Sequence, residues 1–168
     1  MAAITDLSTA SSVNAADYLV LSQSGTDKKV TADKFAVLTS GTFTPGLAFG
    51  GNGVGMTFAS RSGTYVKAGK IVYVSFYIAL SAKGSSTGNV TVTGLPHAAG
   101  AALPDAVGHV GWYQLASNFV NILAIVPAGA TAASIVAYSA AGASYASLTD
   151  AAFANNSIVQ GTIVYQSA

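Results

Sequence analysis

Hydrophobic and polar residues alternate with a period of two in several parts of this chain, which predicts β-strands. The clearest stretch is residues 70–80, where one face is entirely apolar and the other is mixed but uncharged. The apolar face consists of Val72, Val74, Phe76, Ile78 and Leu80. The mixed face carries Tyr73 and Tyr77 among smaller residues. We expect the first face to be core and the two tyrosines to lie in an oligomer interface.

Three further stretches favour strands. Residues 89–93 alternate, with Val90 and Val92 directed inward, and residues 158–165 form a closing strand. Residues 119–126 are apolar on both faces apart from one asparagine, as expected for a strand that is covered on both sides. Turn signals separate the strand-like stretches at intervals of roughly ten residues. Together they predict an all-β fold, an antiparallel β-sandwich of the jelly-roll kind.

The beginning of the chain predicts a smaller unit. Residues 18–21 and 28–31 are strand-like and flank a turn. Thr31 is placed to cap a short helix that carries Phe35 and Leu38. Two short strands and one helical turn bury little surface, so we expect this segment to need a partner.

The density of charge divides the chain near residue 40. Residues 1–38 hold four of the six aspartates and three of the seven basic residues, and the chain has no glutamate. We expect residues 39–42 to form a linker between an N-terminal segment, residues 1–40, and a β-sandwich head domain, residues 41–168. Only 8% of the residues are charged and 51% are hydrophobic, which is unusual for an isolated monomer. Part of the apolar surface is therefore expected in contacts between copies of the chain.

Composition also excludes several classes of function. The net charge is +1 and the basic residues are scattered, so no basic stripe is available to bind nucleic acid. The chain has no cysteine, which removes disulfides and thiolate metal ligands. The longest uncharged span, residues 106–149, is interrupted by Pro127, Gly129 and Gly142, so we expect no membrane insertion. The first residues lack the basic and apolar regions of a secretory signal.

Two groups of residues resemble bacteriophage fibre proteins. Similarity to the attachment motif of phage fibres is carried by residues 4–7, 16–22 and 28–32. Similarity to a fibre head domain is carried by turn glycines and core aromatics. They are residues 43–45, 63–67, 94–96 and 161–165, together with Gly69, Val72, Phe153 and Ile158. The resemblance covers most of the chain, residues 97–150 match least, and Phe43 stands where many relatives carry Trp.

This resemblance implies a virion structural protein, a short homotrimeric fibre or spike on the surface of a phage or phage-like particle. Such a protein is assembled in the bacterial cytoplasm and becomes extracellular with the particle. The resemblance implies that residues 1–40 attach the head to capsid or tail proteins. The attachment residues would be Leu7, Tyr18, Leu19, Leu21 and Phe35. Two alternatives remain: a head-fibre or decoration protein with a purely structural role, and a carbohydrate-binding module, which would need no attachment segment.

One cluster of aromatic and amide side chains is a candidate ligand site. It comprises Trp112, Tyr113, Gln114 and Asn118. Trp and Tyr rings stack on sugar rings and amides bond to hydroxyls, so this cluster is typical of contacts with a host-surface polysaccharide. The alternative is that Trp112 is an anchor of the core or of an interface. Because successive strand residues face opposite ways, we expect one of Trp112 and Tyr113 to be buried and the other exposed.

Catalytic chemistry is not indicated by the sequence. The glycine-rich residues 50–55 lack the lysine of a phosphate loop, and we expect a hairpin turn there. Polysaccharide cleavage usually needs two carboxylates, and the head domain contains only Asp105 and Asp150. His97 and His109 are twelve residues apart without Cys or Glu, although a single histidine beside a threefold axis would be tripled. We therefore predict no enzymatic activity, no metal and no cofactor.

Overall fold

The structure is a computed structural model that describes residues 18–23, 26–31, 38–102 and 104–168. The chain separates into two units, residues 1–37 and residues 38–168. In the first unit, strands β1 (Tyr18–Gln23) and β2 (Thr26–Thr31) pair antiparallel. The two predicted strands are therefore present and paired.

Of the predicted attachment residues, three lie on β1: Tyr18, Leu19 and Leu21. Leu7 and Phe35 lie outside the described residues, as does the helix expected after Thr31. Leu38, which we expected on that helix, instead begins a strand of the second unit.

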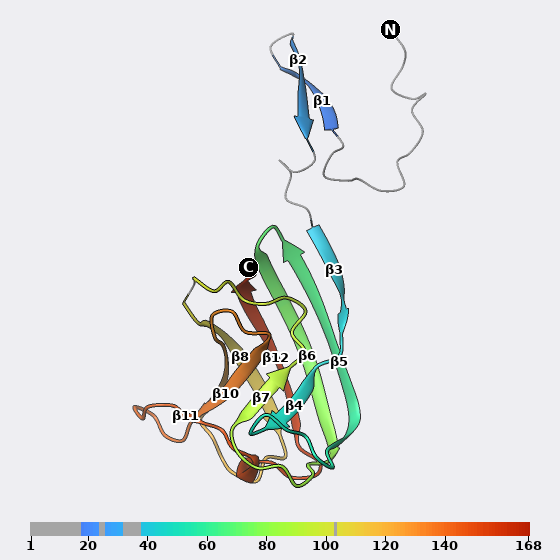
Figure 1. The fold of residues 1–168 in the computed structure, drawn as a ribbon. Coiled ribbons are helices and arrows are strands. Elements are labelled where there is room, and N and C mark those ends of the chain that lie inside the picture. Colours follow the sequence, from blue (N-terminus) through green and yellow to red (C-terminus); the bar gives the residue numbers. More distant parts are fainter. Residues whose placement is uncertain (1–17, 24–25, 32–37, 103) are drawn as a thin grey trace. The chain divides into compact units, whose positions relative to one another are not determined.

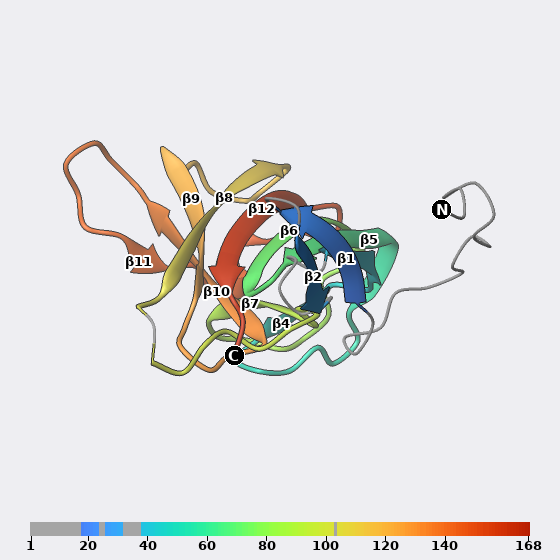
Figure 2. The ribbon, with the colours of Figure 1, turned by 90° about the horizontal axis from the view of Figure 1, so that it is seen from above.

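The second unit is built from ten strands joined into one antiparallel sheet (Figure 1). They are β3 (Leu38–Phe43), β4 (Gly46–Phe49), β5 (Thr57–Ala68), β6 (Ile71–Ala82), β7 (Val90–Thr93), β8 (Ala106–Tyr113), β9 (Asn121–Val126), β10 (Ala132–Tyr138), β11 (Ala146–Ser147) and β12 (Ile158–Gln166). Their order is β3-β5-β6-β12-β8-β9-β10-β7-β4, with β11 beside β10. Viewed from above, the sheet curls so that its two halves face each other (Figure 2). The predicted all-β, antiparallel, sandwich-like fold is confirmed.

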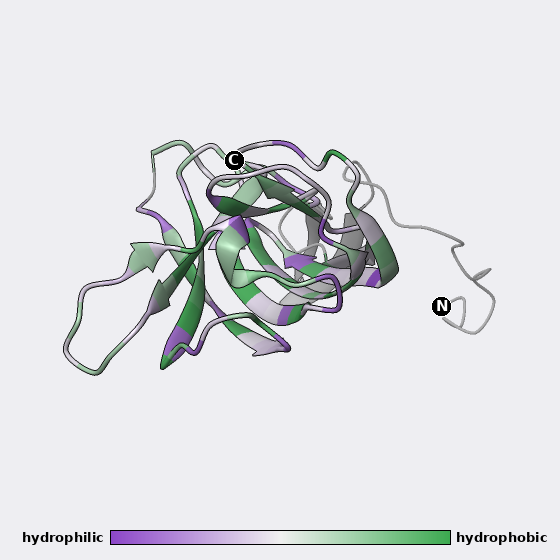
Figure 3. Ribbon diagram, turned by 90° about the horizontal axis from the view of Figure 1, so that it is seen from below, coloured by the Kyte–Doolittle hydropathy of each residue, from purple (hydrophilic) through white to green (hydrophobic). Residues whose placement is uncertain are grey.

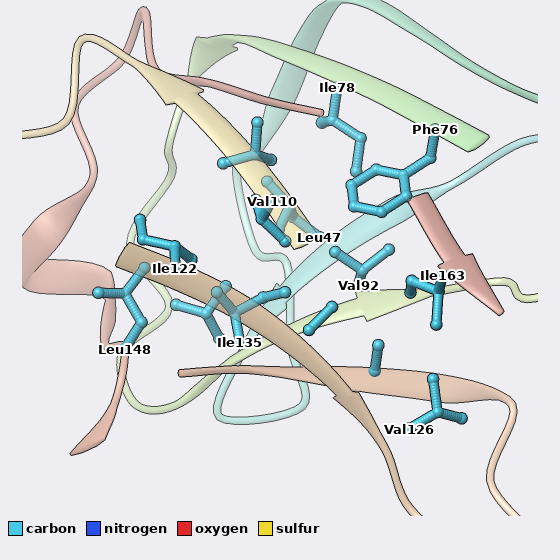
Figure 4. Packing of buried hydrophobic residues seen from close by; sticks show 14 of the residues in the cluster. Leu47, Phe76, Ile78, Val92, Val110, Ile122, Val126, Ile135, Leu148 and Ile163 are labelled. Carbon is cyan, nitrogen blue, oxygen red and sulfur yellow. The ribbon is translucent and has the colours of Figure 1, made fainter. Parts of the chain in front are cut away.

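The core lies inside the curl and follows the predicted alternation. On β6, the side chains of Val72, Val74, Phe76, Ile78 and Leu80 are at most 3% exposed. They belong to one core cluster with buried residues from the opposite half of the sheet, among them Ile122 and Ile135 (Figure 4). In Figure 3, the green segments, which mark hydrophobic residues, recur along the strands of this unit. The described residues contain no helix that is both long and apolar enough to cross a membrane.

The prediction of a linker at residues 39–42 is wrong. These residues belong to β3, which pairs with β5 from Leu38 opposite Ala68 to Phe43 opposite Gly63. Gly41 leaves room for the ring of Tyr65, because a Cβ there would lie 2.8 Å from that ring. The second unit therefore begins at residue 38.

The tight hairpin turn that we expected at residues 50–55 is present at the start of this loop, where Phe49 and Asn52 form an antiparallel bridge around Gly50 and Gly51. The strands on either side of this loop, β4 and β5, do not pair, because β4 pairs with β7 and β5 lies between β3 and β6. The loop contains a tight turn in which Phe49 and Asn52 bond through their backbones, at N···O distances of 2.7 and 3.1 Å. It is therefore a connection between distant parts of the sheet.

Candidate binding face

The outward residues of β3, β5, β6, β12 and β8 form one surface, which we call the open face. The register of these strands brings every second residue of each strand to this side. Along these described strands, the outward positions hold no Lys, Arg, Asp or Glu. Arg61 and Lys67 of β5 do not belong to it, because they lie opposite Ile78 and Val72 of the buried side. A wide sheet surface is thus left without charge.

One part of the open face is strongly apolar, and we call it the apolar end. It comprises Leu38, Val66, Ile71, Tyr73, Val107 and Val164, each between 40% and 70% exposed. The register sets Tyr73 between Val66 on one side and Val164 on the other. Ile71 and Val164 also line a separate cavity of about 290 Å³, whose wall includes Gly100, Pro104 and Asp105. Tyr73, one of the two predicted interface tyrosines, therefore lies among exposed apolar neighbours.

The other part of the open face is polar and concave, and we call it the hollow. Its volume is about 420 Å³. The polar side chains that line it are those of Ser62, Thr64, Ser75, Tyr77, His109, Gln160 and Thr162. Tyr77, the second predicted interface tyrosine, belongs to the hollow and is half-buried there. The two predicted tyrosines thus share a face but have different surroundings.

Strand pairing arranges the lining of the hollow in two lines across β5, β6, β12 and β8, and on β5 these lines begin at Thr64, opposite Ser75, and at Ser62, opposite Tyr77. In the first line, Thr162 lies opposite Ser75 on one side and His109 on the other. In the second line, Gln160 lies between Tyr77 and Gly111. No hydrogen bond found among the described residues 38–102 and 104–168 uses any of the seven polar side chains of the hollow. Their donors and acceptors are therefore open to water or to a ligand.

The cluster predicted from the sequence is divided by the fold. Trp112 is half-buried and packs against the core, whereas Tyr113 is 57% exposed. Tyr113 is two residues from Gly111 on β8 and so stands on the open face at the margin of the hollow. Gln114 and Asn118 are exposed and do not line the hollow. Gln114 ends β8 with a positive φ of 55°, and its backbone oxygen accepts a hydrogen bond from Ser157 Oγ at 2.8 Å.

The two aspartates of the second unit are engaged elsewhere. Asp150 Oδ1 accepts a hydrogen bond from the backbone N–H of Gly88 at 2.8 Å, and Oδ2 lies 3.5 Å from Lys83 Nζ. The Gly88 bond is the main reason why the pKa of Asp150 lies below its ordinary value, and Lys83 lowers the pKa further. Asp105 Oδ1 accepts a hydrogen bond from the backbone N–H of Ala128 at 3.3 Å. Both carboxylates thus hold loops in place.

The two histidines lie in different settings. His109 lines the hollow, whereas the backbone oxygen of His97 accepts a hydrogen bond from the hydroxyl of Tyr165 at 2.8 Å. The ring of His97 meets Tyr65 edge-on, with ring centroids 5.3 Å apart. Among the residues that the structure describes, no three His, Cys, Asp or Glu side chains gather as a metal site.

Most residues that line the hollow were not among the site residues predicted from the sequence. Its hydroxyl residues come from β5, β6 and β12, and no local motif marks them. The sequence pattern could have indicated only that these residues lie on the uncharged side of their strands, the side that on β6 carries Tyr73 and Tyr77. That signal shows the face of a residue but does not show its neighbours on other strands.

Comparisons with known proteins show a similarity of fold but none of sequence. No protein-family model matches the chain, and no curated protein matches it in sequence. Among solved structures, the chain is similar to the Dettilon tailspike protein, with a TM-score of 0.61 and 18% sequence identity. The match covers 75% of this chain and 23% of the tailspike chain, so this chain corresponds to about a quarter of that protein's length. The fold is thus one that occurs in a phage tailspike.

Proposed function

We propose that this chain is a virion structural protein, a homotrimeric fibre or spike of a phage or phage-like particle whose head contacts the host cell surface. The observation that carries the proposal is the fold, which over 75% of the chain is similar to part of a phage tailspike. The resemblance of the sequence to phage fibres points to the same class. Each head would bind weakly, and several heads on one particle would provide avidity.

The apolar end of the open face supports a trimer. Monomeric proteins rarely expose contiguous apolar surface of this kind, and the open face carries no charge that would repel a second copy. We therefore assign the apolar end to contacts between copies of the head.

Sedimentation equilibrium at micromolar concentration tests this assignment. We expect a trimer for the wild-type chain, and dissociation when Val164→Lys places a charge in the apolar end. Val120→Lys is the matched control, because Val120 is 60% exposed on a loop and Val164 is 52% exposed on the open face. A monomeric wild-type chain contradicts the trimer. A trimeric Val164→Lys variant contradicts only the choice of surface.

Residues 1–37 are proposed to attach the head to other virion proteins. Because β3 begins at Leu38 and pairs along β5, a shortened chain that begins at Leu38 retains every strand of the second unit. We expect it to fold and to form trimers but not to join particles. Incorporation of the shortened chain into particles at the wild-type level would refute the attachment role.

Host contact and the absence of catalysis are tested on the same protein. Purified heads should compete with particles for adsorption to host cells, and a lack of competition would favour a purely structural fibre. We propose that the head is not an enzyme, since both of its aspartates are used in hydrogen bonds to the backbone. Release of reducing ends from host polysaccharide by the purified protein would contradict this proposal.

A further inference from the structure

The hollow of the open face has the chemistry of a site for a neutral, hydroxyl-rich ligand. Its side chains offer five hydroxyls, one imidazole and one amide, which together can both donate and accept hydrogen bonds. None of these groups is used in the hydrogen bonds found within the described second unit. A ligand that supplies donors and acceptors of its own would satisfy them, as the hydroxyls of a saccharide do.

The shape of the hollow suits a short oligosaccharide. Its lining spans four paired strands, and at about 4.8 Å between neighbouring strands this gives a length of about 14 Å. Tyr77 lies within the hollow and Tyr113 stands exposed at its margin, so each offers an aromatic surface to a sugar ring. Between Tyr113 and Gln160, Gly111 leaves space, because a Cβ there would have its nearest neighbour 3.7 Å away.

The charge of the surroundings selects between neutral and acidic sugars. An acidic sugar would lose hydration in the hollow without meeting a Lys or Arg on the open face of the described chain. A purely apolar ligand would leave the hydroxyls of the hollow without partners. We infer that the hollow binds a neutral saccharide, an inference that rests on the proposed role of the head in host contact. The residues that would contact the saccharide are Thr64, Tyr77, Tyr113, Gln160 and Thr162.

The test is a glycan array of neutral and uronic-acid-containing bacterial oligosaccharides, probed with the full-length protein. We expect binding to neutral oligosaccharides. The double variant Thr64→Val with Thr162→Val preserves shape and strand preference but removes two hydroxyls, and it should weaken binding at least tenfold. Tyr113→Ala should have a similar effect, because the exposed ring stacks on the sugar.

Matched controls separate the hollow from the rest of the surface. Thr91→Val removes a hydroxyl from β7, on the other half of the sheet, and Tyr145→Ala removes a tyrosine that is 54% exposed outside the open face. Both should bind as the wild type does. Thermal melting shows that each variant is folded before it is applied to the array.

Three results would overturn the inference: preference for acidic oligosaccharides, wild-type binding by the folded hollow variants, or no binding to any oligosaccharide. None of them would by itself refute the proposed virion role. That role depends on the separate measurements of trimer formation, incorporation into particles and competition for adsorption.

Discussion

Two glycines on neighbouring strands should respond in opposite ways to the same added methyl group. Gly161 of β12 lies opposite Phe76 of β6, and a Cβ at residue 161 would be 2.5 Å from the backbone oxygen of His109 and 3.0 Å from the ring of Phe76. The oxygen belongs to the paired strand β8, so it cannot move without disturbing the pairing of β8 with β12. A Cβ at Gly111 meets nothing closer than 3.7 Å.

The magnitudes follow from these distances. Overpacking of this kind costs about 1–3 kcal/mol of unfolding free energy in Gly161→Ala. Gly111→Ala should instead be neutral or stabilising by up to about 1 kcal/mol, because glycine within a strand loses more chain entropy on folding than alanine does. The two variants should therefore differ by roughly 1–4 kcal/mol when both terms are combined.

Thermal unfolding followed by circular dichroism, at equal protein concentration, measures this difference. At about 4 °C per kcal/mol for a unit of this size, the Gly161→Ala melting temperature should fall by roughly 4–12 °C. Gly111→Ala, measured beside it, controls for the general effect of replacing a strand glycine. Equal melting temperatures for the two variants would refute the argument, because they would show that β8 and β12 separate at little cost.

Three more changes test individual side chains. Trp112→Ala should lower the unfolding free energy by about 2–3 kcal/mol, which is less than the loss expected for a fully buried Trp. Tyr113→Ala should leave the melting temperature unchanged, because this side chain is exposed. Equal losses of stability in the two variants would show that both side chains pack against the core. The pKa of Asp150 lies below its ordinary value of 3.8 because Gly88 donates to it, so its contribution to stability is present above that pH and lost below it. In Asp150→Asn, the free energy of unfolding should depend less on pH in that acid range. An unchanged pH dependence would contradict the role of this bond. Burial raises the pKa of Tyr165 above 10.0, so stability should fall as the pH rises beyond 10.0, and Tyr165→Phe should remove this alkaline loss.

Local pattern was sufficient wherever a property depends on one strand alone. The alternation in residues 70–80 predicted β6 and its buried side, because side chains of successive strand residues point to opposite faces. The same reasoning predicted that Trp112 and Tyr113 differ in exposure. It failed at residues 39–42, where Gly41 looked like part of a linker but lies in β3 opposite Tyr65 and leaves room for its ring.

The sequence by itself determined that the chain is an antiparallel β protein with uncharged strand faces, since alternation and composition are properties of short segments. It did not determine which of those faces adjoin. Thr162 meets both Ser75 and His109 only because β12, the last strand, lies between β6 and β8. Strand order and register depend on how the whole sheet curls around its core, so only the tertiary structure decided where the hollow and the apolar end are formed.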